Sequence, residues 1–349
     1  GEMTGEIKER AMDFVYNAIP KASSDKVAGF VNDEIKFMNS LGITYITDIT
    51  LPEDLEAYKI LFEKYSPEVF INSVLPFESY KEFFRLKFPL EKFADKIRFG
   101  GFKAFYDGSL SSETAYFRDN YKNSESCGSK TELVKSGDFE RIGKQIDKNG
   151  YQILVHAIGD EAIKETLDFV EELNTVNGNR DRRFRIEHCQ HISENDVKRF
   201  SELNVIASVQ PAHLEVDATT ATAKLNDTST LHSYKKVLDE KGKIIFGTDF
   251  PVASENPFEN IYYAVSRKTS AYPDGFNTSL AIDIADCLKA YTENNAYAAY
   301  MENKTGKLAV GYQADFIILN NDIFKAKINE IKDTKVEKTF YKGKLIYER

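Results

Sequence analysis

The sequence contains no tryptophan, only three cysteines and only five histidines in 349 residues. The cysteines, Cys127, Cys189 and Cys287, share no close spacing, which argues against a disulfide framework and against a thiolate zinc site. Such cysteine usage fits a reducing compartment, so we expect a cytoplasmic protein. No apolar run approaches the roughly 20 residues that a membrane helix needs, and we expect no association with a membrane.

An excess of positive charge is also missing. Lys and Arg number 46 against 55 Asp and Glu, which gives a net charge of -9, and the basic residues form no cluster. This balance argues against nucleic acid as a partner and leaves a small-molecule substrate as the expectation. The length allows one large domain or two modest ones.

Strand-like and helix-like segments alternate along most of the chain. Apolar runs predict seven strands, at residues 43–49, 68–75, 97–105, 151–156, 184–188, 205–210 and 243–248. Helical periods predict an opening helix through Phe14 and further helices at 27–41, 55–65, 81–88, 139–148, 160–173, 194–203, 258–267 and 280–301. This alternation predicts an α/β fold with a parallel sheet, and an eight-stranded barrel would be one strand short.

Two regions interrupt the alternation. Residues 107–131 are rich in Ser, Asn, Gly and Lys, which predicts a long loop over the barrel mouth that is mobile because it has little apolar surface to anchor it. Residues 307–320 and 336–347 are strand-rich and are separated by no long helix. The tail therefore predicts a small accessory sheet.

Polar side chains stand at the predicted strand ends. Lys103, His156, His188 and Asp249 each close a strand, and His213 follows another within a few residues. In barrels of this kind the chemistry collects at the carboxyl ends of the strands, and histidine nitrogen and carboxylate oxygen are the usual zinc ligands. Each residue alone also fits a structural role, as a hydrogen-bonded histidine, a turn-capping aspartate or a snorkelling lysine. Their coincidence favours a metal site.

Five segments, taken in order, resemble signatures of the amidohydrolase superfamily, specifically of the family 3 branch related to N-substituted formamide deformylase. They are GGFKAFYDGSL at 100–110, HAIGD at 156–160, RIEHCQH at 185–191, SVQPAH at 208–213 and FGTDFPV at 246–252. Segments 290–292, 306–308 and 311–319 resemble the closing helix of that branch and its return to a small β domain.

The resemblance implies a metal-dependent, distorted (β/α)8 barrel hydrolase that uses one or two zinc ions to cleave a C–N bond other than a peptide bond. It implies Lys103, often carboxylated, with His156, His188 and Asp249 as metal ligands. Asp249 would also carry the proton to the leaving amine. His213 would act in catalysis or on the substrate. Three further residues, which lie close to these ligands in the sequence, would orient them: Asp107, Glu187 and Gln190.

Two departures from the family pattern stand out. No histidine precedes Lys103, so the His-x-His pair of the family's first strand is missing, and Glu113 stands where the family usually carries arginine. We therefore expect residues 1–305 to form a barrel with strands two to eight and residues 306–349 to form the C-terminal strands of the accessory domain.

The missing strand leaves alternatives open. The chain is an enzyme by this resemblance, but it is also consistent with an inactive truncated fold, or with a fragment that needs a separate N-terminal segment. Unpaired strand edges at 43–49 and 243–248 favour a homo-oligomer, or association with such a segment, over a closed monomer.

Overall fold

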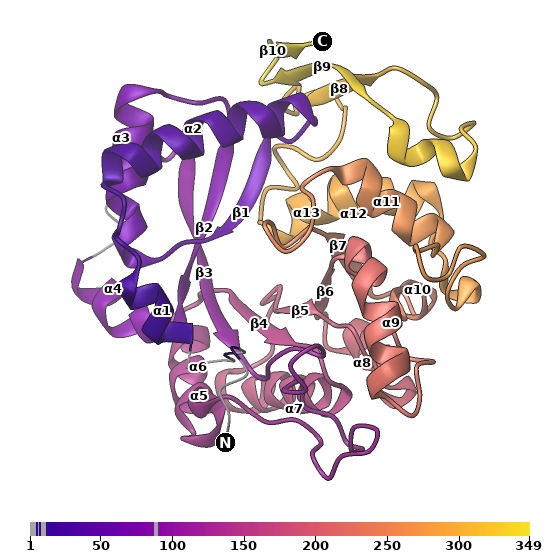
Figure 1. Ribbon diagram of the computed structural model, residues 1–349. Helices are drawn as coiled ribbons and strands as arrows, with labels where there is room; N and C mark the ends of the chain where they lie inside the picture. The colour runs from indigo at the N-terminus through magenta and orange to yellow at the C-terminus, as the bar shows by residue number, and fades with distance from the viewer. Residues whose placement is uncertain (1–4, 6, 8–11, 87–89) are drawn as a thin grey trace.

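Seven parallel strands form one sheet that curls into an open half-barrel (Figure 1). The structure, a computed structural model, describes residues 5, 7, 12–86 and 90–349. Each strand pairs with the next along the chain. Their bounds are β1 Tyr45–Ile49, β2 Phe70–Pro76, β3 Ile97–Phe105, β4 Ile153–Ala157, β5 Arg185–His188, β6 Ile206–Val209 and β7 Lys243–Phe246. Consecutive residues of β4, β5 and β6 are buried, as a parallel sheet covered on both faces requires.

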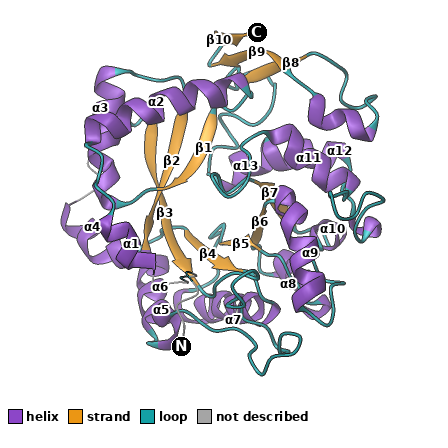
Figure 2. Cartoon of the chain, viewed as in Figure 1, coloured by secondary structure: helices purple, strands orange, loops and turns teal. Residues whose placement is uncertain are grey.

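Helices cover the outer face of this sheet (Figure 2). The longest, α7 Asp160–Asn177, buries Ile163, Leu167 and Val170, which recur at helical spacing. The other α-helices are α1 Asp13–Ala18, α2 Ser24–Ser40, α3 Leu55–Lys64, α4 Tyr80–Leu86, α5 Glu132–Lys135, α6 Asp138–Lys148, α8 Glu194–Glu202, α9 Leu214–Lys224, α10 Tyr234–Asp239, α11 Pro257–Ser266, α12 Ile284–Tyr291 and α13 Glu293–Ala298. Short 3-10 turns include η5, Pro211–His213, which leads directly into α9.

The sheet does not close, because β1 and β7 are its two ends and, within the described residues, no strand pairs with their outer edges. Side chains of α13 partly cover the β7 edge. Asn294 Nδ2 donates to the carbonyl of Ile244 at 3.0 Å, and Asn295 Nδ2 donates to the carbonyl of Phe246 at 3.0 Å. Tyr45 of β1 packs against a cluster formed by Ala296 of α13 and by Ala299 and Met301, which follow this helix. The short helix α13 therefore lies between the two open edges.

A second, antiparallel sheet stands beside α2 at the C-terminal end of the chain (Figure 1). Its strands are β8 Phe316–Leu319, β9 Val336–Tyr341 and β10 Lys344–Glu348, in the order β10-β9-β8. The Thr339 hydroxyl donates to the carbonyl of Asn39 at 2.7 Å, which fixes the sheet to the end of α2. At Gly42 (φ +85°) a side chain would lie 2.8 Å from Ile317, so glycine is needed both for the turn and for this close approach.

The α/β half-barrel with a small accessory sheet confirms the predicted fold, and all seven strands lie within two residues of their predicted ends. The predicted helix at 280–301 is wrong as a single element, because Thr292 (φ -119°, ψ -90°) separates α12 from α13. Helices α9 and α10 were not expected. The opening helix and the helix at 81–88 fall partly on residues outside the described ranges. Among the described residues, no helix is long and apolar enough to cross a membrane.

Candidate active site

Three of the predicted site residues meet at the C-terminal ends of β3, β4 and β5. The rings of His156 and His188 lie edge to face, with centroids 4.5 Å apart. The half-exposed ring of Phe105 links this pair to Lys103, since its centroid lies 5.1 Å from the His156 ring and 5.3 Å from Lys103 Nζ. Lys103, His156 and His188 are all buried. Neighbouring parallel strands therefore bring together residues that are far apart in the sequence.

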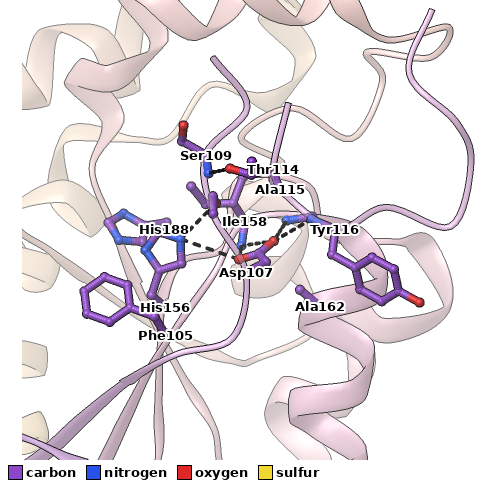
Figure 3. A network of polar contacts seen from close by, with 12 residues as sticks. Phe105, Asp107, Ser109, Thr114, Ala115, Tyr116, His156, Ile158, Ala162 and His188 are labelled. Carbon is purple, nitrogen blue, oxygen red and sulfur yellow. Dashed lines mark hydrogen bonds and ion pairs between the residues drawn. The ribbon is translucent and has the colours of Figure 1, made fainter. Parts of the chain in front are cut away.

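Outer contacts fix the His156 ring, as Figure 3 shows. Its Nε2 lies 3.0 Å from the carbonyl of Gly108 and 3.5 Å from Asp107 Oδ1. Because a carbonyl can only accept, Nε2 carries the hydrogen and Nδ1 keeps a free lone pair. Asp107 is itself held by the backbone N–H groups of Tyr116 and Gly159, at 2.8 and 2.9 Å, and burial raises its pKa to about 7. Asp107 therefore lies beside His156, and its role in orienting that ring stays a prediction.

His188 is fixed in the opposite sense. Its Nδ1 lies 2.9 Å from Gln210 Oε1, and the amide of Gln210 donates through Nε2 to the carbonyl of Ser208 at 3.3 Å. That second bond sets which end of the amide faces the ring, so Nδ1 donates and Nε2 is left free. His188 also adopts φ +75°, a left-handed conformation that is uncommon for a residue other than glycine.

Burial keeps both histidines neutral. It lowers the pKa of His156 to about 3 and the pKa of His188 well below its ordinary value. Neutral imidazole is the form that binds metal ions, because a protonated ring has no lone pair to give. Two adjacent rings therefore each offer one unprotonated nitrogen, Nδ1 of His156 and Nε2 of His188.

Lys103 lies in the same interior with its charge disfavoured. Burial lowers its pKa, the nearby guanidinium of Arg185 lowers it further, and Glu187 opposes both. Glu187 itself is paired with Arg185, whose Nε lies 2.8 Å from Oε1. Although burial raises the pKa of Glu187, the charge of Arg185 brings it below its ordinary value. Glu187 therefore acts on Lys103 through charge, not through a described hydrogen bond.

Gln190 and Asp249 make few contacts at the candidate site. Gln190 is buried, but its side-chain Oε1 has no hydrogen-bond partner among the described residues. Asp249 is exposed, adopts φ +57°, and is placed by the turn that follows β7. Desolvation raises its pKa, and the nearby side chains of His213 and Lys103 oppose that rise. Neither residue makes a described contact with His156 or His188.

His213 reaches the site from the start of α9. Its Nε2 lies 3.2 Å from the carbonyl of Thr248, and its ring centroid lies 6.3 Å from that of His188. Counting only His, Cys, Asp and Glu, the described residues contain no group of three that could hold a metal ion. A metal at this position therefore needs Lys103, or a ligand from elsewhere, beside the two histidines.

Sequence reasoning missed Gln210 and the Gly108 carbonyl, which are the partners that decide the ring orientations. Gln210 carried a usable signal, because it closes the predicted strand next to the one that ends in His188 and therefore emerges at the same edge of the sheet. The Gly108 carbonyl carried none, since a backbone atom cannot be recognised from residue type.

Comparison with known proteins decides the family. Residues 1–347 match the model described as the amidohydrolase family. The chain belongs to this family. It is 31% identical over 364 residues to the protein LONG AFTER FAR-RED 3 of Arabidopsis thaliana, covering 99% of this chain and 62% of that protein. It is 27% identical over 365 residues to the putative amidohydrolase YtcJ of Bacillus subtilis, covering 100% and 66%.

Solved structures agree on the fold of this amidohydrolase. An uncharacterized metal-dependent hydrolase from Pyrococcus horikoshii matches with a TM-score of 0.79 at 23% identity, over 94% of this chain and 67% of that chain. An adenosine deaminase from Xanthomonas campestris, solved with bound zinc, matches with a TM-score of 0.64 at 13% identity, over 96% and 72%. The chain spans about two thirds of the length of the curated relatives it matches.

Proposed function

We propose that this amidohydrolase holds a divalent metal ion, with zinc the first candidate, through His156 Nδ1, His188 Nε2 and Lys103, and hydrolyses a non-peptide C–N bond of a small molecule. One observation carries the proposal. Two adjacent neutral histidines each have one nitrogen fixed by an outer hydrogen bond and the other nitrogen free. Histidines that bind metals show this arrangement, because the outer partner sets the tautomer and the ring orientation.

The names of relatives support the reaction class. An N-substituted formamide deformylase of Arthrobacter pascens is 23% identical over 221 residues, covering 62% of this chain and 40% of that protein. A 5-methylthioadenosine/S-adenosylhomocysteine deaminase of Caldanaerobacter subterraneus is 25% identical over 173 residues, covering 46% and 37%. Both names describe cleavage of a C–N bond outside a peptide.

A cytoplasmic location also remains part of the proposal, supported by three free cysteines.

Lys103 would complete the ligand set after carboxylation. Its lowered pKa favours the neutral amine, whose lone pair can attack CO2; the N–C bond forms and one proton is released. The product carries a carboxylate where the neutral amine stood, which suits both the metal and the nearby cation of Arg185. When bound, the metal would supply Lewis-acid activation of water.

Asp249 would move the proton. An exposed carboxylate after β7 can accept a proton from the attacking water at one oxygen and deliver it to the leaving nitrogen, and its raised pKa makes it a better base for this exchange. His213, beside Thr248, lies where it can hold the substrate or take over that proton. A role for Asp249 as a further ligand requires that its loop turn toward the histidines.

A second candidate follows from the open sheet. The unpaired edges of β1 and β7 and the lack of a three-residue His, Cys, Asp or Glu cluster among the described residues favour a chain that is inactive alone and is completed by a separate N-terminal segment or by a second copy. The two candidates share the same histidine pair and differ in whether this chain suffices.

Turnover of N-substituted formamides with added zinc tests the proposal. We expect zinc-dependent release of amine, and we expect Asp249→Asn, which keeps the size but removes the base, to lose at least about 100-fold in kcat, roughly 2.7 kcal/mol. Asp239→Asn, at an exposed ion pair with Lys235, is the control and should change little. Full turnover by Asp249→Asn would assign the proton transfer elsewhere. A wild-type chain that binds zinc but releases no amine would support the second candidate.

A further inference from the structure

A hydrogen-bonded pair of a buried histidine and a partly buried carboxylate lies one helical turn away from His213. His232 Nε2 lies 3.0 Å from Asp217 Oδ2, and the exposed fractions of the two side chains are 1% and 14%. Burial holds the pKa of His232 well below its ordinary value, so the ring is neutral and donates Nε2–H to the carboxylate. Asp217 follows His213 by four residues on the continuous η5–α9 segment, which places both on one helical face.

The other contacts of His232 lead to β5. Its backbone N–H donates to the carbonyl of Gln190 at 2.7 Å, two residues beyond His188. Its ring stacks on Tyr234 with centroids 4.9 Å apart, and the Tyr234 hydroxyl donates to the carbonyl of His188 at 3.2 Å. The Asp217–His232 hydrogen bond therefore joins α9, which directly follows His213, to the strand end that carries His188.

Because charged groups are buried around Asp217 and His232, this polar pair has a desolvation cost that an element serving stability alone would avoid. Arg267 is buried and directs its guanidinium at three carbonyls, those of His232, Leu231 and Phe276, and no carboxylate pairs with it in the part of the chain that the structure describes. Burial of Asp217 raises its pKa, and the charge of His213 opposes that rise. An apolar pair would fill this space at a lower desolvation cost. The polar pair therefore calls for a reason beyond stability.

We propose that Asp217 and His232 are positioning residues, which together fix His213 at its distance from His188. The inference rests on the proposed function, in which His213 faces the substrate beside the metal. Neither residue touches the reacting atoms. Their single hydrogen bond sets how far the start of α9 stands from the end of β5, and a displacement of about 1 Å there can cost up to 100-fold in rate.

His191 provides a matched control. It is as buried as His232, and its pKa is also lowered by burial, to about 3. Its Nδ1 lies 3.4 Å from the Thr230 hydroxyl, it packs edge to face on Phe117, and its Nε2 has no partner among the described residues. Replacing His191 by leucine therefore removes the same side-chain volume as replacing His232 by leucine, but it breaks no hydrogen bond to α9.

The first experiment compares His232→Leu, His232→Gln and His191→Leu in zinc-dependent turnover. Glutamine carries its amide nitrogen near the position of histidine Nε2 and keeps the donor, whereas leucine removes it. We expect His232→Leu to lose about 10-fold or more in kcat with KM and zinc content unchanged, and His232→Gln and His191→Leu to stay within about threefold of the wild type. Equal losses in all three variants would overturn the proposal.

A second experiment does not depend on activity. His213 is the least buried histidine, so diethyl pyrocarbonate should label it fastest, as read by mass spectrometry. We expect about threefold faster labelling of His213 in His232→Leu, and wild-type rates in His232→Gln and His191→Leu. A wild-type chain without turnover would count against the proposed function only, because labelling still reports the position of His213. Unchanged labelling in His232→Leu would overturn the positioning role.

Asp217→Leu provides an independent test in case His232→Leu fails to fold. It removes the acceptor instead of the donor, and the double variant Asp217→Leu/His232→Leu removes both. Because one hydrogen bond links the two residues, we expect the double variant to lose no more kcat than either single variant. Additive losses would show that the residues act independently and would contradict the proposal.

Discussion

Burial alone does not distinguish the candidate metal ligands from the other histidines. His156, His188, His191 and His232 are all buried, and burial lowers the pKa of each. What sets His156 and His188 apart is that their rings are 4.5 Å apart while the nitrogen of each that faces outward is already hydrogen-bonded. A free ring nitrogen beside a second such ring therefore distinguishes His156 and His188 from His191 and His232.

The lowered pKa of His191 predicts how stability depends on pH. Its pKa is about 3 in the folded chain and 6.5 ordinarily, so between these values the unfolded chain binds a proton that the folded chain does not. Stability must then fall as the pH drops below 6.5, by roughly 1 kcal/mol per pH unit for this group. Urea unfolding at pH 7.0 and pH 5.5 should show a smaller loss for His191→Gln than for the wild type. Equal losses would show that His191 is protonated in the folded chain.

Elements with a strong apolar pattern were predictable from the sequence, and elements held by tertiary contacts were not. The strand ends at Lys103, His156 and His188 follow from short apolar runs. The buried residues of helix α9, Leu214, Ala218 and Ala221, do recur at helical spacing, but two of the three are alanines, so the apolar stripe in its sequence is weak. The pairing of Asp217 with His232 depends on how α9 packs, which no spacing along the chain reveals.

The loop at 107–131 was expected to be mobile because it has little apolar surface to anchor it. That premise is wrong. Four of its side chains are buried and pack with α9 in one cluster: Leu110, Ala115, Phe117 and Tyr121. The loop is also tied to α9 by Lys122, whose backbone N–H donates to the carbonyl of Lys224 at 2.8 Å, and by Glu113, which lies 2.6 Å from Lys224 Nζ. The charge of Glu113 is therefore already paired.

This anchoring predicts slow hydrogen exchange in the loop. The amides of Phe117 and Tyr121 donate to the carbonyls of Cys127 and Ser126, at 2.8 and 2.9 Å, and should be protected. Tyr121→Ala should remove that protection, because deleting a large buried side chain costs about 3 kcal/mol or more. Asn120→Ala, at an exposed position beside it, serves as the control. Exchange at these amides as fast as in an unfolded peptide would restore the expectation of a mobile loop.

For the whole molecule, the open sheet is the feature that limits stability, because β1 and β7 have no strand partner at their outer edges among the described residues. Asn294 and Asn295 supply side-chain donors for two carbonyls of β7, which reduces the cost of that edge. Each buried amide left without a partner costs about 1 to 3 kcal/mol, a large fraction of a net stability of about 5 to 15 kcal/mol. The accessory sheet has free edges as well, on β8 and β10, among the described residues.

The open edges predict association. We expect the chain at micromolar concentration to form a homo-oligomer, or to bind a separately supplied N-terminal segment, because strand addition would pair the outer edges of β1 and β7. Light scattering checks this directly. A monodisperse monomer that unfolds in one cooperative transition would show that side chains such as Asn294 and Asn295 satisfy the edges without a partner.

Metal content decides whether His156 and His188 are metal ligands. Protein purified without chelator and then equilibrated with zinc should carry at least about one equivalent, as measured by elemental analysis, and His156→Gln or His188→Gln should lose most of it. His191→Gln should retain it, because that ring has no neighbouring ligand. Less than about a tenth of an equivalent in the wild type, or equal content in all three variants, would contradict the assignment of His156 and His188 as ligands.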